Sequence, residues 1–148
     1  MATKYRVLIL GASYGSLVGA KIALAGHTVR LVCLPEEVSL INAKGARVLL
    51  PVRGIDGLIE LNSQGMPGDL SATGPSEADP GAHDLVVLSM QEPHYGAPEI
   101  RALIDRIAVS GKPCMSVMNM PRFSGKNVAS IPQNSAMSLR SCSFSSAR

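Results

Sequence analysis

Short apolar runs alternate with amphipathic stretches along most of the chain. Residues 7–10 form a continuous apolar run that ends at Gly11, a pattern typical of a parallel strand buried on both faces. Apolar positions at helical spacing follow from about residue 14 to residue 25, and residues 29–33 are predicted to form the next strand. The chain therefore begins in the order of a β-α-β unit, with a glycine turn between the first strand and its helix.

A second helix is predicted to begin at Pro35 and to stop near Gly45. Proline needs no backbone N–H in a first helical turn, and the carboxylates of Glu36 and Glu37 favour the positive end of the helix dipole. Two strand-like pieces follow, and then a stretch rich in Gly, Pro, Ser and Asp that we interpret as a surface connection. The strand-like pieces are residues 47–52 and 58–61, and the surface connection is residues 65–81.

The alternation of strand and helix then continues. Residues 84–90 are predicted to be a strand, residues 98–108 a helix, and residues 114–118 a buried strand that leaves Asn119 at its carboxyl end. This pattern predicts an α/β fold, a Rossmann-like doubly wound parallel sheet in one domain over residues 1–121. The apolar stripe of the predicted helix consists of Ile100, Leu103, Ile104 and Ile107.

Residues 122–148 follow a different pattern. Eight of these 27 residues are serine, none is acidic, and no apolar period persists. We interpret the segment as an irregular, unpacked tail. Its composition is typical of a disordered extension or of a shifted reading frame in place of the proper continuation, and the sequence leaves both open.

Composition agrees with one globular domain and limits its partners. Apolar residues make up 46% of the 148 residues and charged residues 17%, which favours a core between helices and a sheet. The net charge of +3 is uneven, since residues 1–111 carry 9 basic and 11 acidic side chains whereas residues 112–148 carry 5 basic and none acidic. The basic segment lacks clustered charge and interleaved aromatics, so we expect no specific nucleic-acid partner.

A membrane span and a metal site are both disfavoured. Lys21, His27 and Arg30 interrupt the long apolar stretch near the start, and no convincing cleavage site follows it, so we expect a cytoplasmic location. The three cysteines stand far apart with no zinc spacing, which predicts neither a disulfide framework nor a metal site. We expect Cys33 and Cys114 to be small buried hydrophobic residues. The third cysteine is Cys142.

The turn after the first strand carries the main candidate chemistry. A glycine turn that leads into a helix aims backbone N–H groups and the positive end of the helix dipole at an anion, commonly a nucleotide diphosphate. The match to G-x-G-x-x-G is partial: serine replaces the second and third glycines, or a glycine one position earlier supplies the packing glycine. The alternative is a strand–helix turn without a ligand. The candidate cofactor-binding residues are Gly11, Ala12, Ser13, Tyr14, Gly15 and Ser16, and the packing glycine is Gly15.

The choice between NAD and NADP stays open on the residues alone. An NAD site has an acidic residue about 20 positions beyond the first glycine, and an NADP site has Arg or Lys nearby. The chain has Leu31-Val-Cys-Leu34 there. We interpret Glu36 and Glu37 only as first-turn helix residues.

These features together resemble the N-terminal domain of the ketopantoate reductase (2-dehydropantoate 2-reductase) family over roughly residues 5–121. The resemblance is carried by the glycine turn, Gly26-His-Thr-Val, Leu40-Ile-Asn-Ala-Lys-Gly45, Asp84-Leu-Val-Val-Leu and Asn119. It implies an NADPH-binding Rossmann domain that precedes a helical domain with the catalytic lysine and much of the 2-keto acid pocket. That lysine has no counterpart in this chain.

The resemblance also implies particular site residues. Asn119 is the candidate catalytic residue, because it matches the family's asparagine near the cleft between the domains. The family's 2′-phosphate arginine falls on Leu34, the lysine after the Asp84 strand on Gln91, and the glycine after the asparagine on Met120. The expected function is NADP-dependent reduction of a small 2-keto acid, with NAD as the alternative cofactor. The alternative function is a truncated nucleotide-binding module without catalysis, and the oligomeric state is left open.

One histidine has a position that suits ligand contact. His94 follows a predicted strand in a loop with Pro and Gly, at the sheet edge where α/β folds bind ligands. His27 and His83 are interpreted as residues at a helix end and a loop end.

Overall fold

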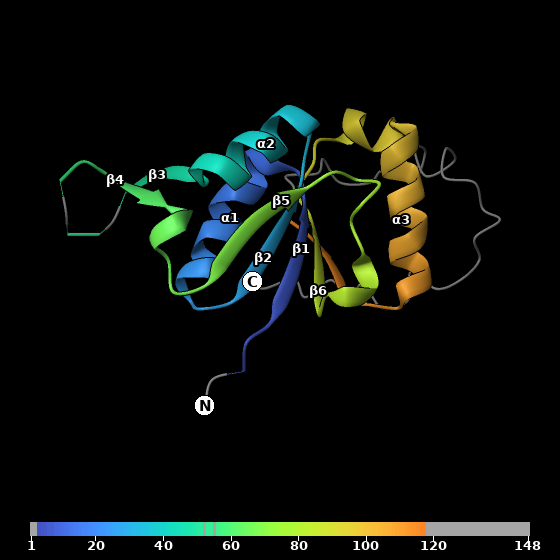
Figure 1. The fold of residues 1–148 in the computed structure, drawn as a ribbon, viewed down its shortest axis with the longest axis horizontal. Helices are drawn as coiled ribbons and strands as arrows, with labels where there is room; N and C mark the ends of the chain where they lie inside the picture. Colours follow the sequence, from blue (N-terminus) through green and yellow to red (C-terminus); the bar gives the residue numbers. More distant parts are fainter. Residues whose placement is uncertain (1–2, 52, 55, 118–148) are drawn as a thin grey trace, which may run out of the picture.

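A five-stranded parallel sheet forms the centre of the computed structural model, which describes residues 3–51, 53–54 and 56–117 (Figure 1). The strand order is β5-β2-β1-β6-β7, and every pair in it is parallel. This is the predicted α/β, Rossmann-like architecture, in which the chain builds outward from β1 in both directions. The strands are β1 (Arg6–Leu10), β2 (Thr28–Val32), β5 (Asp69–Thr73), β6 (Leu85–Leu88) and β7 (Cys114–Ser116).

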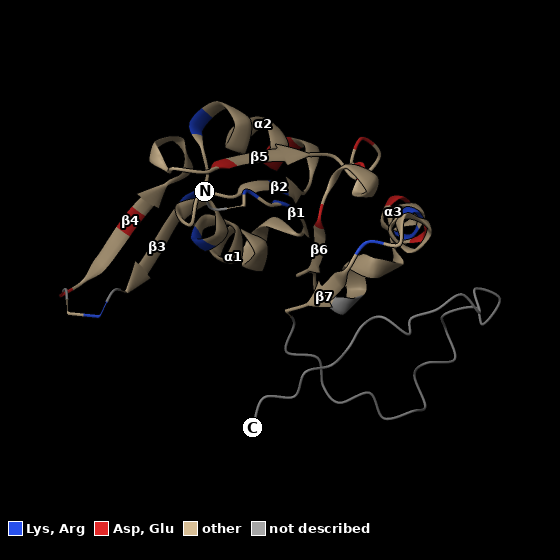
Figure 2. Ribbon diagram, turned by 90° about the horizontal axis from the view of Figure 1, so that it is seen from below, with Lys and Arg blue, Asp and Glu red and all other residues tan. Residues whose placement is uncertain are grey.

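Helices cover both faces of this sheet. Alternate residues of a strand point to opposite faces, so Val7 and Ile9 pack under α1 (Ala12–Leu24) and α2 (Pro35–Lys44). Leu8 and Leu10 face the other way, toward α3 (Pro98–Ser110). Figure 2 shows α1 and α3 on opposite sides of the strands. Residues 7–10 of β1 are thus buried on both faces of the sheet, as their continuous apolar run predicts.

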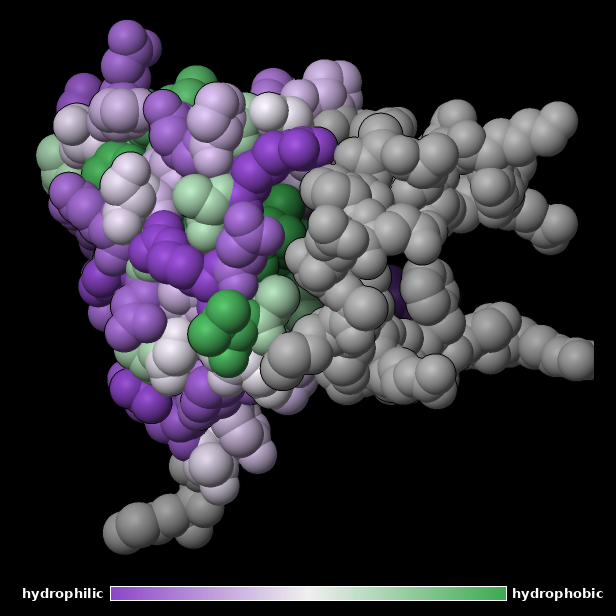
Figure 3. All heavy atoms as spheres, turned by 90° about the vertical axis from the view of Figure 1, so that its right-hand side faces the viewer, coloured by the Kyte–Doolittle hydropathy of each residue, from purple (hydrophilic) through white to green (hydrophobic). Residues whose placement is uncertain are grey.

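The predicted apolar stripe of α3 is confirmed for three of its four residues, and the fourth, Ile104, is half-buried. Ile100, Leu103 and Ile107 are buried, and the helix ends at Gly111, whose φ of 63° lies in the left-handed region that favours glycine. Figure 3 views this side of the molecule, where the described surface is largely hydrophilic with a few scattered hydrophobic residues. Within the described residues, no helix has both the length and the apolar character needed to cross a membrane.

A two-stranded antiparallel hairpin extends away from the main sheet (Figures 1 and 2). It consists of β3 (Arg47–Pro51) and β4 (Leu58–Asn62), which lie in the two pieces that the sequence predicts as strands. Arg47 and Glu60 form an ion pair across it at 3.5 Å. Three short 3-10 turns complete the described chain: η1 (Ser63–Gly65), η2 (Pro80–Ala82) and η3 (Glu92–Gly96).

The prediction of a surface connection over residues 65–81 is wrong for its central part. Asp69–Thr73 is β5, which pairs in parallel with β2 and forms one edge of the sheet. The strand is only five residues long and carries Asp, Ser and Thr beside Gly and Pro, so its composition imitates a loop. Its burial comes from neighbours distant in sequence, because Leu70 and Ala72 pack into the cluster under α1 and α2.

A side chain of α2 hydrogen-bonds to the outer side of this edge strand at Ala72. The Asn42 amide donates to the carbonyl of Ala72 at 3.0 Å and accepts from the N–H of Ala72 at 2.8 Å. Asn42 therefore attaches α2 to the middle of β5.

Several element boundaries also differ from prediction, and β7 is not the buried strand expected there, because Cys114 is half-buried and Met115 and Ser116 are exposed. Helix α1 begins at Ala12 rather than near Tyr14, and β7 ends at Ser116. Asn119, Met120 and the predicted tail over residues 122–148 lie outside the described residues.

Candidate functional site

A cleft of about 750 Å³ opens at the carboxyl ends of β1, β2, β5 and β6. Chain order reverses here, since β1 leads to β2 on one side while β6 lies on the other side of β1. Open α/β sheets bind ligands at this kind of switch point. The described residues that line the cleft are residues 11–14, 32–35, 37–39, 74–77, 89–91, 94, 97, 99 and 100.

The turn from β1 into α1 forms one wall. Gly11 has a φ of 100°, which favours glycine, and its N–H donates to the carbonyl of Val32 at 2.8 Å. A Cβ there would lie 2.8 Å from Cγ of Met90, so the turn also requires glycine for its close approach to the segment after β6. Helix α1 then begins with no acidic residue in its first turn and no side-chain cap. The first amides of α1 are therefore open toward the cleft.

Gly15 and Ser89 hold this turn against the sheet. A Cβ on Gly15 would lie 2.8 Å from Cγ2 of Ile9 and 2.9 Å from Oγ of Ser89, so only glycine lets α1 approach so closely. The buried Ser89 hydroxyl hydrogen-bonds to the carbonyls of Leu10 at 2.7 Å and Gly11 at 3.2 Å. Gly15 thus occupies the packing position that the sequence pattern predicts.

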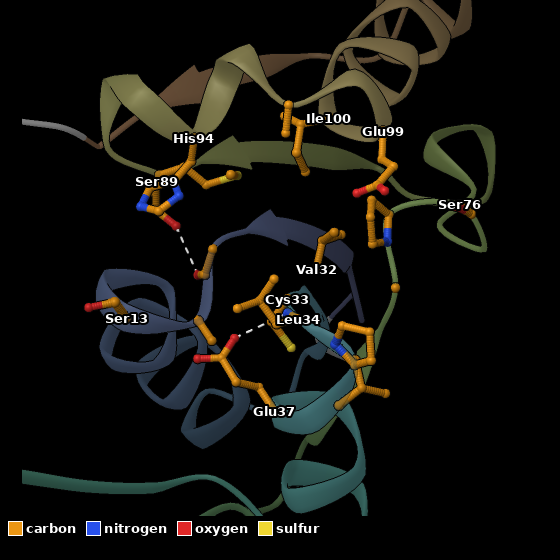
Figure 4. Close-up of a pocket in the computed structure, with 18 of the residues that line it drawn as sticks. Ser13, Val32, Cys33, Leu34, Glu37, Ser76, Ser89, His94, Glu99 and Ile100 are labelled. Carbon is orange, nitrogen blue, oxygen red and sulfur yellow. Dashed lines mark hydrogen bonds between the residues drawn. The ribbon is translucent and has the colours of Figure 1, made fainter.

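The turn from β2 into α2 forms the facing wall (Figure 4). The Glu37 carboxylate accepts a hydrogen bond from the N–H of Leu34 at 3.1 Å and so caps α2. Leu34 is 69% exposed, whereas Cys33 beside it is buried. Burial, together with the charge of Glu37, raises the pKa of the Cys33 thiol from 9.0 to about 11. Cys33 therefore stays protonated at neutral pH, in agreement with its prediction as a small buried hydrophobic residue.

The loop after β5 forms the third wall and is held from α3. The guanidinium of Arg106 donates to the carbonyls of Pro75 at 2.5 Å, Ser76 at 3.3 Å and Ala78 at 2.8 Å. Three hydrogen bonds from one planar group fix the path of this loop, so that Ser76 and Glu77 line the cleft.

The segment after β6 closes the fourth side. Gln91 and His94 line the cleft there, and both side chains are exposed. The N–H of Met90 donates to the hydroxyl of Tyr95 at 3.4 Å, and burial raises the pKa of Tyr95. His94 thus has the location that the sequence predicts, at the carboxyl edge of the sheet.

The charged side chains around the cleft are mainly acidic. Among the described residues that line it, Glu37, Glu77 and Glu99 carry carboxylates and none is Lys or Arg. Positive potential at this site comes from the start of α1 rather than from a basic side chain. Elsewhere too, the described residues contain no cluster of three or more His, Cys, Asp or Glu side chains suited to a metal ion.

The structure brings together most of the sequence-predicted site residues. Six of them line the cleft, namely Gly11, Ala12, Ser13, Tyr14, Leu34 and Gln91. Gly15 lies beneath it against the sheet, and the Ser16 hydroxyl donates to the carbonyl of Ala12 within α1. Asn119 lies outside the described residues.

Sequence reasoning missed Ser89 and the wall made by residues 74–77. The predicted strand over residues 84–90 contains Ser89, whereas β6 ends at Leu88, so Ser89 is the first residue after the strand only in the structure. Residues 74–77 had no signal either, because β5 itself was read as a loop. Glu37 was assigned only to the first turn of its helix, yet its side chain folds back to Leu34 and lines the cleft.

The sheet order and the position of the cleft define a Rossmann-type doubly wound domain. Among solved structures, the chain is similar to a protein from Ralstonia solanacearum MolK2 assigned as a ketopantoate reductase. The TM-score is 0.51 and the sequence identity 22%, and the match covers 76% of this chain and 31% of that one.

A second similar structure is a protein from Enterococcus faecalis assigned as a 2-dehydropantoate 2-reductase, with a TM-score of 0.50 and 20% identity. The match covers 77% of this chain and 34% of that one. The chain thus spans about a third of the length of these two proteins, and it shares their fold. No protein-family model and no curated protein matches the sequence.

Proposed function

We propose that this domain binds a nicotinamide dinucleotide and is the cofactor-binding domain of an oxidoreductase of the ketopantoate reductase type. The observation that carries the proposal is the open start of α1, which lies at the switch point of the sheet and faces a cleft of about 750 Å³. The shared fold of the two ketopantoate reductase structures supports it. The resemblance of this chain to the ketopantoate reductase family implies NADPH as the dinucleotide and a small 2-keto acid as the substrate. It also implies a cytoplasmic location.

The cleft fits such a cofactor in its dimensions and donor groups. The amides of Ala12 and Ser13 would hold the diphosphate, because they start a helix whose own residues supply no anion. The β2–α2 wall at Leu34 would flank the adenosine ribose, and Gln91 would lie toward the nicotinamide half. When bound, a reduced nicotinamide supplies a hydride for carbonyl reduction. We place Asn119 with the carbonyl substrate on the strength of the family resemblance.

A second candidate function is dinucleotide binding without catalysis. It is favoured by the neutral residues Leu34 and Gln91, which stand in the cleft wall where the resembling family has cations. Without these two cations, the cleft binds the groups at the two ends of the dinucleotide less tightly.

Titration of the full 148-residue chain with NAD⁺ and NADP⁺ tests the proposal. We expect the amide NMR resonances of residues 11–14 to shift on binding, and Ser13→Asp to weaken binding at least tenfold because its carboxylate competes for the same amides. Ala102→Asp is the matched control, since Ala102 is exposed on α3 and does not line the cleft.

Unmoved resonances with both dinucleotides in a folded sample would contradict the proposal. An assay of NADPH or NADH oxidation with ketopantoate then separates the two candidates, because binding without turnover supports the second.

A further inference from the structure

We propose that Glu37 makes this cleft select a dinucleotide whose adenosine ribose carries a free 2′-hydroxyl, that is NAD(H), over one with a 2′-phosphate. The inference rests on the proposed function and departs from the cofactor that the family resemblance implies. It is carried by the position of one carboxylate and by the charges around it.

Glu37 brings its carboxylate back to Leu34, two residues beyond the end of β2 and near the place where an NAD site has its acidic residue. One oxygen accepts the N–H of Leu34 at 3.1 Å, so the group is fixed at the β2–α2 turn rather than free in solvent. Figure 4 shows the side chain reaching from α2 toward the wall that carries Ser13. A carboxylate accepts more than one hydrogen bond, and the hydroxyls of a ribose are suitable donors for its second oxygen.

The buried thiol of Cys33 lies close to this carboxylate, on the same wall of the cleft. Glu37 contributes to the raised pKa of Cys33, which lines the same wall. Glu37 itself lines the cleft, so its negative charge lies on the wall that would flank the adenosine ribose.

No basic side chain of the described cleft lining offsets that charge. Leu34 is aliphatic and 69% exposed, at the position that aligns with the family's arginine. Arg106 is committed to three carbonyls of the loop after β5. Glu77 and Glu99 add further negative charge to the lining.

The dipole of α2 is the one feature that favours a phosphate here, and it is outweighed. A helix start is equivalent to roughly half a positive charge, whereas Glu37 carries a full negative charge. Moreover, the N–H of Leu34 is already used by Glu37, and Pro35 has no N–H to offer. A 2′-phosphate, with about 1.5 to 2 negative charges, would face this carboxylate, and only the N–H groups of Glu36 and Glu37 remain in the first turn to offset it.

Isothermal titration of the full chain with NAD⁺ and with NADP⁺ measures this preference directly, independent of turnover. We expect NAD⁺ to bind at least tenfold more tightly. Glu37→Gln should reduce the ratio severalfold, because glutamine keeps an oxygen for the Leu34 N–H and removes the charge. Glu36→Gln makes the same change of net charge at a neighbouring residue outside the cleft lining, and should leave the ratio unchanged.

A second variant weakens the preference by adding a cation instead of removing the carboxylate. Leu34→Arg places a cation at an exposed position of the cleft wall, and we expect it to strengthen NADP⁺ binding about tenfold with little change for NAD⁺. Circular dichroism of each variant shows that it is folded.

The outcomes distinguish failure of the assignment to Glu37 from failure of the proposed dinucleotide-binding function. If NADP⁺ binds as tightly as NAD⁺ or more tightly, the assignment to Glu37 is overturned while the proposed function stands. If the ratio is unaffected by Glu37→Gln and changes with Glu36→Gln, general charge rather than Glu37 sets it, and the assignment fails. If neither dinucleotide binds to folded protein, the proposed function fails as well.

Discussion

Helices α1 and α2 both begin at the cleft, each directly after a strand of the same sheet, but they begin differently. Helix α1 follows a glycine turn and has neither a side-chain cap nor a carboxylate in its first turn. Helix α2 begins with Pro35, and Glu37 caps it through the N–H of Leu34. The N-terminus of α1 is open to an external anion, whereas the N-terminus of α2 is already capped by the carboxylate of Glu37.

The contrast places an open helix start and a capped helix start side by side in one cleft. Repeating the same β-α turn would create two anion sites at one sheet edge. Here the second turn supplies an acceptor, so the cleft has a donor wall at Ala12 and Ser13 and an acceptor wall at Glu37. A dinucleotide needs both, because its diphosphate accepts hydrogen bonds whereas its ribose hydroxyls donate them.

The open start depends most strongly on Gly15. Gly15→Val should lower the free energy of unfolding by about 3 kcal/mol or more, because Cβ alone would lie 2.8 Å from Ile9 and 2.9 Å from Ser89. Urea denaturation measures the loss. In Gly65→Ala the new Cβ meets nothing within 4 Å, and the change should stay within about 0.5 kcal/mol. Equal stability of the two variants would show that α1 does not need this close approach.

Near the capped start of α2, the buried thiol of Cys33 makes the free energy of unfolding depend on pH in the alkaline range. Its pKa is about 11 in the folded chain against 9.0 for an ordinary thiol, so the unfolded chain loses this proton first as pH rises. The contribution of the protonated thiol to the free energy of unfolding is complete below pH 9 and is lost as pH rises through 11. At pH 11 it has fallen by about 2 kcal/mol.

Denaturation of the wild type and of Cys33→Ala between pH 8 and 11 isolates this effect from other titrating groups. The difference in stability between the two proteins should shrink as pH rises through this window. A constant difference would mean that Cys33 is not buried beside Glu37.

The cap itself has the smallest expected effect. Glu37→Ala removes the acceptor for the Leu34 N–H and should destabilise the fold by about 1 kcal/mol. Glu36→Ala removes a neighbouring carboxylate that makes no such bond, and should cost only about 0.3 kcal/mol through the helix dipole. Thermal denaturation of both variants at low salt compares them, and equal losses would leave the dipole as the whole effect.

The central strands and α3 could be predicted from the sequence because their signals are local. Strand β6 and most of β1 are continuous apolar runs, and the stripe of Ile100, Leu103 and Ile107 repeats at helical spacing. Strand β5 could not be predicted in this way, since its burial depends on contacts with β2 and α1. A short edge strand needs few apolar residues of its own, so its sequence resembles a turn.

The residues of the candidate site also fall into those that local sequence signals predict and those that depend on contacts distant in the chain. The glycine turn and Gln91 lie where a strand ends, so their position in the cleft follows from chain order. The inward path of Glu37 depends on a side-chain rotamer, which the spacing of residues does not fix. The wall at Ser76 and Glu77 depends on three hydrogen bonds from Arg106, some thirty residues away.

Asn42 has a consequence for how the molecule avoids joining other chains. The outer strand of a sheet is a template on which a further polypeptide can align and begin aggregation or strand exchange. At Ala72 the Asn42 amide acts as one residue of an extra strand, because it both donates to and accepts from the peptide group. An incoming polypeptide would first have to displace that amide, so the rim is protected at its middle by a single side chain.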